Sequence, residues 1–451
     1  MNETIAAIAT PPGEGAIAIL RLSGNKAVPI ADKIFRGKTK PSLMKSRQLY
    51  FGKIIRESET IDEVLLSIFR APESYTGEDV VEISGHGGAL VARRVLETAL
   101  EAGARLARPG EFTQRAYLHG KIDLTKAEAI MDLITAQTVR AQRAATEQLS
   151  GRLGDEMVLL RENLLAAVAH LEAFLDFPEE DISPATGHAL RAHLEENRQH
   201  LLRLLSTADE GRVLREGMRL ALCGAPNAGK SSLLNRLLGI DRAIVSNVPG
   251  TTRDTIEEIA TLGGFPFRLV DTAGLRLTDD LVEQEGVRRA EEIAASADLA
   301  LHIVDAKKLQ EPISSIATNE LLVLNKIDLI DSAQDRLHLE NNYPTAIPIS
   351  CATGEGIEVL VKTIIERVTS KKPTPTEAPL SSVTINARHT VCLARALQFL
   401  NDALQLFDTE QPPELLATEL HAALDAIGEV VGTADTEEIL GEIFGQFCIG
   451  K

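Results

Sequence analysis

The sequence predicts a multidomain protein of mixed α/β and α class, with an N-terminal α+β domain and an α/β domain inserted into a discontinuous helical domain. A glycine-rich loop at 224–231 lies between an apolar run typical of a buried strand and a helical pattern. Apolar residues at helical spacing fill one stretch before this loop and another well after it. Residues 1–118 instead mix short apolar runs with turn signals, which is typical of strands and loops.

Length, charge and cysteine usage narrow the class of protein. At 451 residues the chain is longer than a single hydrophobic core supports. Its 47 Lys+Arg and 65 Asp+Glu give a net charge of -18, which argues against a nucleic-acid binder that relies on bulk charge. Cys223, Cys351, Cys392 and Cys448 lack metal-ligand spacing, so we expect neither a disulfide framework nor a zinc site. Without a signal-peptide pattern or a long apolar run, we expect a soluble cytoplasmic protein with no membrane contact.

Residues 1–118 form the first predicted domain. The expected elements are strands over 5–9, 16–22, 64–69 and 80–84, and a helix over 89–102 closed by Gly103. A basic run lies between these strands. Such runs are usually solvated surface, and the sequence leaves open whether this one also binds RNA or a protein partner. The run comprises Arg21, Lys26, Lys33, Arg36, Lys38, Lys40, Lys45, Arg47 and Lys53.

The helical domain is predicted to be discontinuous, over 119–212 and 380–451. Leu160, Leu164, Val168 and Leu171 repeat at helical steps before the loop, and the same pattern returns at 393–407 and 416–427. Each such helix must bury its apolar stripe, so the simplest arrangement packs the two stretches together. Residues 213–379 are then an inserted domain, whose last part, the proline-rich 371–379, is a stiff linker.

The loop itself reads G-A-P-N-A-G-K-S. A preceding strand and a following helix direct backbone N–H groups and the helix N-terminus at phosphate oxygens, as in a P-loop. We expect Lys230 to reach the β- and γ-phosphates and the Ser231 hydroxyl to ligate Mg²⁺. The predicted contacts of this segment are Asn227, Ala228, Gly229, Lys230, Ser231 and Ser232.

Further motifs follow at predicted strand ends. V-D-T-A-G at 270–274 supplies a carboxylate near the magnesium and an N–H for the γ-phosphate. The segment 250–254, in a polar loop that follows Pro249, fits a switch whose threonine closes on Mg²⁺ when the γ-phosphate is present. The predicted nucleotide contacts here are Ser246, Asn247, Val248, Pro249, Gly250, Thr251, Thr252, Asp271, Thr272, Ala273 and Gly274.

The base-binding motif N-K-I-D follows at 325–328. Asp328 can accept two hydrogen bonds from guanine, and adenine would leave that carboxylate unpaired. Asn325 and Lys326 accompany it, Lys326 lying over the base. With Ser350, Cys351 and Ala352 completing the base pocket, the order of the motifs predicts a GTPase.

The position after D-T-A-G holds Leu275. Many small GTPases have a glutamine there that orients the attacking water, and leucine cannot do so. Acidic side chains in the following segment, 276–283, are candidates for this role. The chemistry alone does not select one of them.

Motifs beyond the nucleotide segment point to one family. They are A-T-P-P-G-E-G at 9–15, T-G-E-D at 76–79, G-H-G-G at 85–88, R-P-G-E-F-T-Q-R-A at 108–116 and the terminal C-I-G-K at 448–451. Together with G-T-T-R-D at 250–254 and D-T-A-G-L-R at 271–276, they cover the chain from end to end. The sequence resembles the tRNA modification GTPase MnmE (TrmE) family.

The resemblance implies an N-terminal tetrahydrofolate-binding and dimerisation domain, a discontinuous helical domain and an inserted GTPase domain. It implies a homodimer that works with the flavoprotein MnmG (GidA), so that FAD and NADH enter only through this partner. The pair would add a carboxymethylaminomethyl or aminomethyl group to C5 of the wobble uridine, position 34, of certain tRNAs. A tetrahydrofolate derivative would supply the one-carbon unit.

The resemblance also assigns roles to residues. Asn227, Ser246, Val248 and Thr251 match the ligands of a K⁺ ion that would neutralise developing phosphate charge. Ser231 and Thr252 match the Mg²⁺ ligands. Glu283 matches the residue that orients water, and Lys230, Arg253 and Asp254 complete the expected catalytic set.

For the folate, the matching positions are Arg21, Glu82, Lys121 and Lys451. A carboxylate suits the donor groups of a pterin and cations suit a glutamate tail. Without the match, Arg21 and Glu82 would be read as an ordinary ion pair between strands. Cys448 lies where the family keeps a cysteine near the folate, in a chemical or a structural role.

A second class of function remains open at this stage. The central motifs alone would equally suit a ribosome-assembly or regulatory GTPase whose outer domains only bind partners. Such a protein is expected to bind no folate, and binding of 5-formyltetrahydrofolate would separate the two hypotheses.

Overall fold

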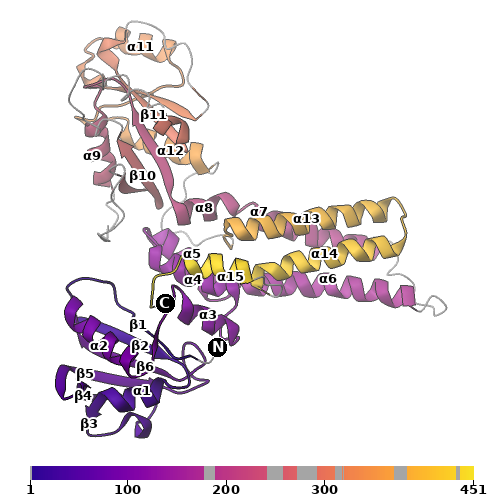
Figure 1. Cartoon of the computed structure of the whole chain (residues 1–451). Helices are drawn as coiled ribbons and strands as arrows, with labels where there is room; N and C mark the ends of the chain where they lie inside the picture. Colours follow the sequence, from indigo (N-terminus) through magenta and orange to yellow (C-terminus); the bar gives the residue numbers. More distant parts are fainter. Residues whose placement is uncertain are drawn as a thin grey trace. The chain divides into compact units, whose positions relative to one another are not determined.

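The computed structural model describes residues 3–176, 188–240, 257–271, 292–309, 317, 319–369, 383–432 and 437–450. The chain divides into two compact units. Figure 1 shows the elements of the chain, coloured by residue number. Unit 1 contains residues 1–131, 153–166 and 421–451, and unit 2 contains residues 132–152 and 167–420. Helices α4 (Leu124–Thr135), α6 (Arg152–Asp176) and α14 (Pro413–Val431) contribute residues to both units.

Unit 1 is built on a seven-stranded sheet with the order β3-β4-β5-β6-β2-β1-β7. Its pairs are antiparallel except for the parallel pair β1–β7. The strands are β1 (Ile5–Ile8), β2 (Ile17–Ser23), β3 (Phe35–Gly37), β4 (Leu49–Arg56), β5 (Glu59–Phe69), β6 (Val80–His86) and β7 (Arg105–Leu106). The four predicted strands are confirmed, whereas β3, β4 and β7 were not predicted.

Helices α1 (Ala27–Ile34) and α2 (Ala89–Glu101) share a core with this sheet. Alternate residues of the strands face that core, so Val64, Leu66 and Ile68 of β5 are buried. Strand β4 was missed because Lys53 and Gly52 interrupt its apolar alternation. The predicted helix over 89–102 is confirmed as α2.

The last part of the chain packs within unit 1. Phe444 and Phe447, from α15 (Glu437–Gly445) and just after it, share a small core with Leu124. Gly110, at the start of α3 (Glu111–Leu118), has φ 65°, and a Cβ there would lie 2.5 Å from the Phe444 carbonyl oxygen. Only glycine fits this contact, which joins segments more than 300 residues apart.

Unit 2 contains a six-stranded sheet with the order β13-β12-β11-β8-β10-β9. The strands are parallel except for the antiparallel pair β10–β9. They are β8 (Met218–Cys223), β9 (Glu257–Leu262), β10 (Phe265–Asp271), β11 (Leu299–Asp305), β12 (Glu320–Asn325) and β13 (Ile347–Pro348). The helices next to the sheet are α9 (Lys230–Ile240), α11 (Ala333–Asn342) and α12 (Ile357–Thr369). This arrangement confirms the predicted α/β class of the inserted domain.

Two short helices share the core of this sheet. Ala141 and Ala144 of α5 (Val139–Leu149) and Val213 of α8 (Ala208–Glu216) belong to the same buried cluster as the strands. Arg140 adds a cation–π contact, its guanidinium carbon 4.5 Å from the centre of the Phe265 ring. Helices α5 and α8 therefore pack as part of the α/β domain.

The helices on either side of the inserted domain pack against each other within unit 2, as predicted. Helix α7 (His188–Leu205) precedes the α/β domain in the sequence and α13 (Ala387–Asp408) follows it. Arg191 donates to both carboxylate oxygens of Asp408, at 2.7 and 3.0 Å. The predicted linker at 371–379 and the two domain boundaries at 212/213 and 379/380 stay predictions, the linker lying outside the described residues.

Among the helices that the structure describes, none combines the length and the apolar composition needed to cross a bilayer.

Candidate nucleotide site

The glycine loop is held by two close contacts of its backbone. Gly224 and Gly229 have φ of 136° and 105°, a region that side-chain-bearing residues avoid. A Cβ at Gly224 would lie 2.1 Å from the Ile303 carbonyl oxygen, and one at Gly229 would lie 2.1 Å from Asn325 Nδ2. The motif therefore needs glycine at both positions, between strand β8 and helix α9 as predicted.

Lys230 lies inside the curve of the loop. Its side chain is buried, and Nζ donates to the carbonyl oxygens of Gly224 at 2.7 Å and Ala225 at 3.0 Å. Ser231 and Ser232 follow in the first turn of α9 and are exposed. A buried ammonium group beside an open helix N-terminus is a suitable receptor for the phosphates of a nucleotide.

Asn325 connects the phosphate loop to the base-binding loop. Its buried side chain donates from Nδ2 to the Ala228 carbonyl oxygen at 2.9 Å, and its Oδ1 accepts from the Cys351 N–H at 3.2 Å. The prediction made Asn325 a nucleotide contact. These two hydrogen bonds also position the two loops, and each end of the amide keeps one free donor or acceptor site, so the nucleotide contact stays a prediction.

Lys326 is paired with a residue that the sequence analysis missed. Its backbone is left-handed, with φ 66°, and Nζ donates to the Asn227 carbonyl oxygen at 2.9 Å and to Asp305 Oδ2 at 2.8 Å. Burial acts to raise the pKa of Asp305, but hydrogen bonds from Lys326 and from the Lys307 backbone outweigh it and lower the pKa. A carboxylate at the end of apolar strand β11 was the available signal.

The remaining base-pocket residues gather at the ends of β12 and β13. Asp328 lies in the short helix η3 (Ile327–Leu329), half-buried. Arg236 of α9 donates to the carbonyl oxygens of Cys351 at 2.9 Å and Ala352 at 2.8 Å, and Ser350 is fully buried. Burial raises the pKa of Cys351, as expected for a packing residue rather than a nucleophile.

Many predicted site residues lie outside the described residues. They are Ser246, Asn247, Val248, Pro249, Gly250, Thr251, Thr252, Arg253, Asp254, Thr272, Ala273, Gly274, Glu283 and Lys451. The backbone of Asp271 ends β10 beside Leu222 of β8, and therefore next to the start of the phosphate loop. The predicted role of its carboxylate near magnesium stays a prediction.

A second group of predicted residues gathers in unit 1. Arg21 of β2 and Glu82 of β6 are cross-strand partners, with Nε and Nη2 of the arginine 2.9 and 2.8 Å from Glu82 Oε1. The guanidinium carbon of Arg21 also lies 5.5 Å from the ring centre of Tyr75 and 5.7 Å from that of Phe112. Arg21 and Glu82 thus form the ion pair that strand register alone would favour, within an aromatic setting that the sequence did not reveal.

Lys121 and the end of the chain lie against the same part of unit 1. Lys121 Nζ donates to the Pro72 carbonyl oxygen at 3.0 Å, in the loop that carries Tyr75. A Cβ at Gly450 would lie 2.4 Å from the Ile8 carbonyl oxygen of β1. The terminal segment therefore contacts β1, the strand that pairs with the strand of Arg21. Cys448, two residues earlier, is exposed.

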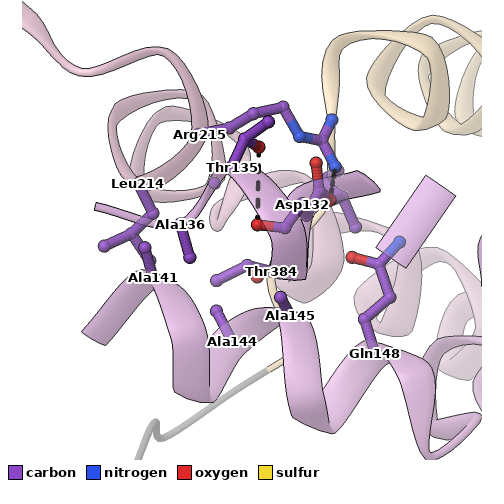
Figure 2. Close-up of a pocket in the computed structure, with 12 residues that line it drawn as sticks. Asp132, Thr135, Ala136, Ala141, Ala144, Ala145, Gln148, Leu214, Arg215 and Thr384 are labelled. Atoms are coloured by element: carbon purple, nitrogen blue, oxygen red, sulfur yellow. Dashed lines mark hydrogen bonds and ion pairs between the residues drawn. The ribbon is translucent and has the colours of Figure 1, made fainter. Parts of the chain in front are cut away.

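A small pocket in unit 2 lies apart from these motifs (Figure 2). Its lining includes Ala144 and Ala145 of α5, and Arg215 pairs with Asp132 at one side. None of the predicted nucleotide residues lines it.

Comparisons with known proteins agree with the end-to-end motifs. The MnmE helical domain family matches residues 124–448, and the family described as GTP-binding protein TrmE N-terminus matches residues 4–121. The chain belongs to the MnmE (TrmE) family of GTPases. A relative named tRNA modification GTPase MnmE in Akkermansia muciniphila is 45% identical over 453 residues, which span 100% of this chain and 99% of the relative.

Other MnmE relatives match over the same extent. One in Moorella thermoacetica is 45% identical over 469 residues, covering 100% of both chains. Among solved structures, the G domain of the T. maritima FeoB iron transporter is 27% identical and covers 33% of this chain and 98% of its own, with a TM-score of 0.25. That score is too low to add to the assignment.

Proposed function

We propose that this member of the MnmE family hydrolyses GTP in the course of tRNA modification. The observation that carries the proposal is the match to relatives named tRNA modification GTPase MnmE along the whole of both chains. The glycine loop with its buried Lys230 supports the hydrolytic part. The matches to the TrmE N-terminal family and the MnmE helical domain family support the part concerned with modification.

In the proposed site, backbone N–H groups of the loop bind the β- and γ-phosphates. Lys230 would exchange its bonds to Gly224 and Ala225 for bonds to phosphate oxygens. The exposed Ser231 hydroxyl, at a helix N-terminus, suits the hard-oxygen coordination of Mg²⁺, with Thr252 as the other protein ligand. Mg²⁺ would neutralise charge on the phosphates.

Guanine selection falls to Asp328. Its carboxylate makes no hydrogen bond with any residue that the structure describes, so it can accept both donors of guanine. Asn325 fixes the distance between this pocket and the phosphate loop. Ser350, Cys351 and Ala352 form the other wall, held from behind by Arg236.

Hydrolysis is proposed to depend on K⁺ and on Glu283. Leu275 cannot orient water, so Glu283 would do so, with Arg253 and Asp254 shaping the closed switch. Asn227 has a left-handed backbone, φ 65°, and an exposed side chain at the tip of the loop. Its amide oxygen is of the kind that K⁺ accepts, with Ser246, Val248 and Thr251 as further ligands.

The cluster around Arg21 is proposed to bind a tetrahydrofolate derivative. The aromatic rings of Tyr75 and Phe112 suit a flat pterin, Glu82 suits its donor groups, and Lys121 and Lys451 suit the glutamate tail. Cys448 is exposed in the adjoining terminal segment. With an MnmG (GidA) partner, the protein would modify C5 of the wobble uridine in the cytoplasm.

We further propose that a second copy of the chain covers the outer face of the N-terminal sheet. Phe51 and Leu65 are paired on neighbouring strands, so their side chains lie on one face of the sheet. Leu49 and Ile17 lie on the same face, because each is two residues away from a position that the strand pairing places there. All four are exposed, Phe51 by 63%. Exposed large apolar side chains gathered on one face of a folded domain are typical of an interface between subunits.

Folate binding tests the proposal most directly. Equilibrium titration of the purified chain with 5-formyltetrahydrofolate should show saturable binding, which removal of residues 448–451 weakens. The truncated protein should keep GTP hydrolysis and lose modification in a reconstituted system. Absence of folate binding would instead favour a ribosome-assembly or regulatory GTPase.

The cation mechanism has its own test. Initial rates of GTP hydrolysis should be higher in KCl than in NaCl at equal ionic strength, and Asn227→Ala should remove the difference. Equal rates of the unchanged protein in both salts would contradict the K⁺ assignment and leave the tRNA assignment standing.

A further inference from the structure

A concentrated positive surface lies at one corner of unit 1. Residues 26–47 contain seven cations and one carboxylate, Asp32, in a chain whose net charge is -18. They belong to α1, the edge strand β3, the 3-10 helix η1 (Pro41–Leu43) and the loop that leads to β4. Figure 1 shows α1 and β3 together at this edge of the sheet. The cations of this basic corner are Lys26, Lys33, Arg36, Lys38, Lys40, Lys45 and Arg47, all of them exposed.

The backbone of the corner is fixed by buried anchors. Pro41 and Met44 are buried on either side of η1. The Ser42 N–H donates to Asp32 Oδ1 at 2.9 Å, which ties η1 to α1. Arg36 folds over the end of α1, its Nη1 donating to the carbonyl oxygens of Asp32, Lys33 and Phe35. The basic corner is therefore a preformed surface.

Few of these charges are neutralised. Lys40 pairs with Asp32 at 3.4 Å, and Arg47 pairs with Glu73 at 2.8 Å. Lys33 and Arg36 hydrogen-bond only to carbonyl oxygens among the described residues, which leaves their charges in place. Lys26, Lys38 and Lys45 make no side-chain hydrogen bond or ion pair with any described residue. Five positive charges thus stand without a carboxylate.

We infer that the basic corner binds the phosphodiester backbone of RNA. The inference rests on the proposed function, because it names the surface on which the chain would hold its tRNA. Exposed lysines and arginines contact phosphates through charge and release counterions on binding. Because the chain as a whole is acidic, the rest of its surface would repel RNA. The RNA would therefore be oriented with its backbone at the basic corner.

The composition of the corner favours RNA over an acidic protein. Lysine is depleted in protein–protein interfaces, and five of the seven cations here are lysines. Leu43 is exposed by 75% at the tip of η1, but an isolated leucine is not the aromatic-rich centre that such interfaces use.

A charge-neutralised variant tests the inference. Lys26→Gln, Lys38→Gln and Lys45→Gln together remove three cations that hold no part of the fold. The matched control, Arg93→Gln, Arg161→Gln and Arg203→Gln, removes three exposed cations elsewhere and makes the same change in net charge. Binding of a fluorescently labelled tRNA transcript would be measured for each full-length protein by anisotropy between 50 and 200 mM KCl.

The triple lysine variant should bind the transcript at least about tenfold more weakly at 100 mM KCl, with a salt slope shallower by about 2 to 3. The control should bind like the unchanged protein, and both variants should keep GTP hydrolysis. Equal binding by the lysine variant and the unchanged protein would overturn this inference alone. If the lysine variant then failed to assemble with a partner, the basic corner would instead bind an acidic protein. No binding by the unchanged protein would overturn the tRNA part of the proposed function as well.

Discussion

The phosphate loop of unit 2 and the Arg21 cluster of unit 1 are assembled in opposite ways. The loop is a run of consecutive residues, and its ligand-facing groups are backbone N–H groups whose directions follow from Gly224 and Gly229. The Arg21 cluster joins side chains from β2, β6, the 72–77 loop and α3, with the last residues of the chain beside it. A site made of backbone depends on local conformation, whereas a site made of side chains depends on the packing of the whole unit.

This difference determines how each site should respond to mutation. In the loop, we expect one buried cation and two glycines to provide most of the nucleotide binding. A single substitution there should therefore weaken nucleotide binding strongly and affect only the nucleotide. In the Arg21 cluster several contacts share the task, and the support beneath them, centred on Glu111, should affect stability before it affects binding. Four substitutions test this difference between the two sites.

The largest effect is expected at Lys230. Lys230→Met keeps the volume of the side chain but removes the ammonium group from the loop, so GTP hydrolysis should fall by about 10³-fold. Steady-state phosphate release measures it. Lys362→Met, an exposed lysine of α12, is the control and should be unchanged. A loss of less than tenfold at Lys230 would show that the loop does not depend on this cation.

Glu111 is next, as the support of unit 1. It is buried and accepts from Arg105 and Arg115; burial acts to raise its pKa, but these hydrogen bonds lower it to about 2. Because the folded pKa lies below the ordinary 4.5, the stabilisation is complete above about pH 5 and is lost as pH falls toward 2. Glu111→Gln should therefore lose about 3 kcal/mol near pH 7.

The measurement for Glu111 is chemical denaturation of both proteins from pH 7 to pH 3. The difference in unfolding free energy between them should shrink as pH falls. Glu63→Gln, which removes an exposed pair with Lys53, should change stability by less than about 0.5 kcal/mol at any pH. A difference that does not vary with pH would contradict the ionised state of Glu111.

A smaller effect is expected at Asp328. Asp328→Asn replaces one acceptor by a donor, so GTP affinity should fall about 30-fold, while affinity for xanthosine triphosphate, which carries an acceptor at that position, should rise. Fluorescent-nucleotide competition measures both. Asp331→Asn, an exposed neighbour, should leave both affinities unchanged. Parallel loss of both nucleotides would indicate general damage to the pocket.

The smallest effect is expected at Tyr75. Its hydroxyl shares a hydrogen bond with Thr113 Oγ1 at 2.9 Å while its ring faces Arg21. Tyr75→Phe keeps the ring and frees its orientation, so 5-formyltetrahydrofolate should bind about three- to fivefold more weakly, with GTP hydrolysis unchanged. Tyr50→Phe, which also removes a hydrogen-bonded hydroxyl in this domain, should bind folate normally. Equal binding by Tyr75→Phe would remove Tyr75 from the folate site.

The elements that could be predicted from the sequence are those specified by neighbouring residues in the chain. The P-loop, the strands that deliver it, the base-binding motif and the helical stretches follow from glycine conformation, apolar periodicity and motif order. Packing between the helical stretches before and after the inserted domain was predicted because each needed to bury a one-sided apolar stripe, and α7 and α13 show it. Strand β4 was missed because Gly52 and Lys53 interrupt its apolar alternation.

Only the tertiary structure decided which side chains meet. It paired Lys326 with Asp305, gave Asn325 to the backbone of two loops, and placed Arg21 between Tyr75 and Phe112. It also brought Gly450 to the end of β1. No local pattern encodes these contacts, because each depends on strand register and on close approaches between segments that lie far apart in the chain.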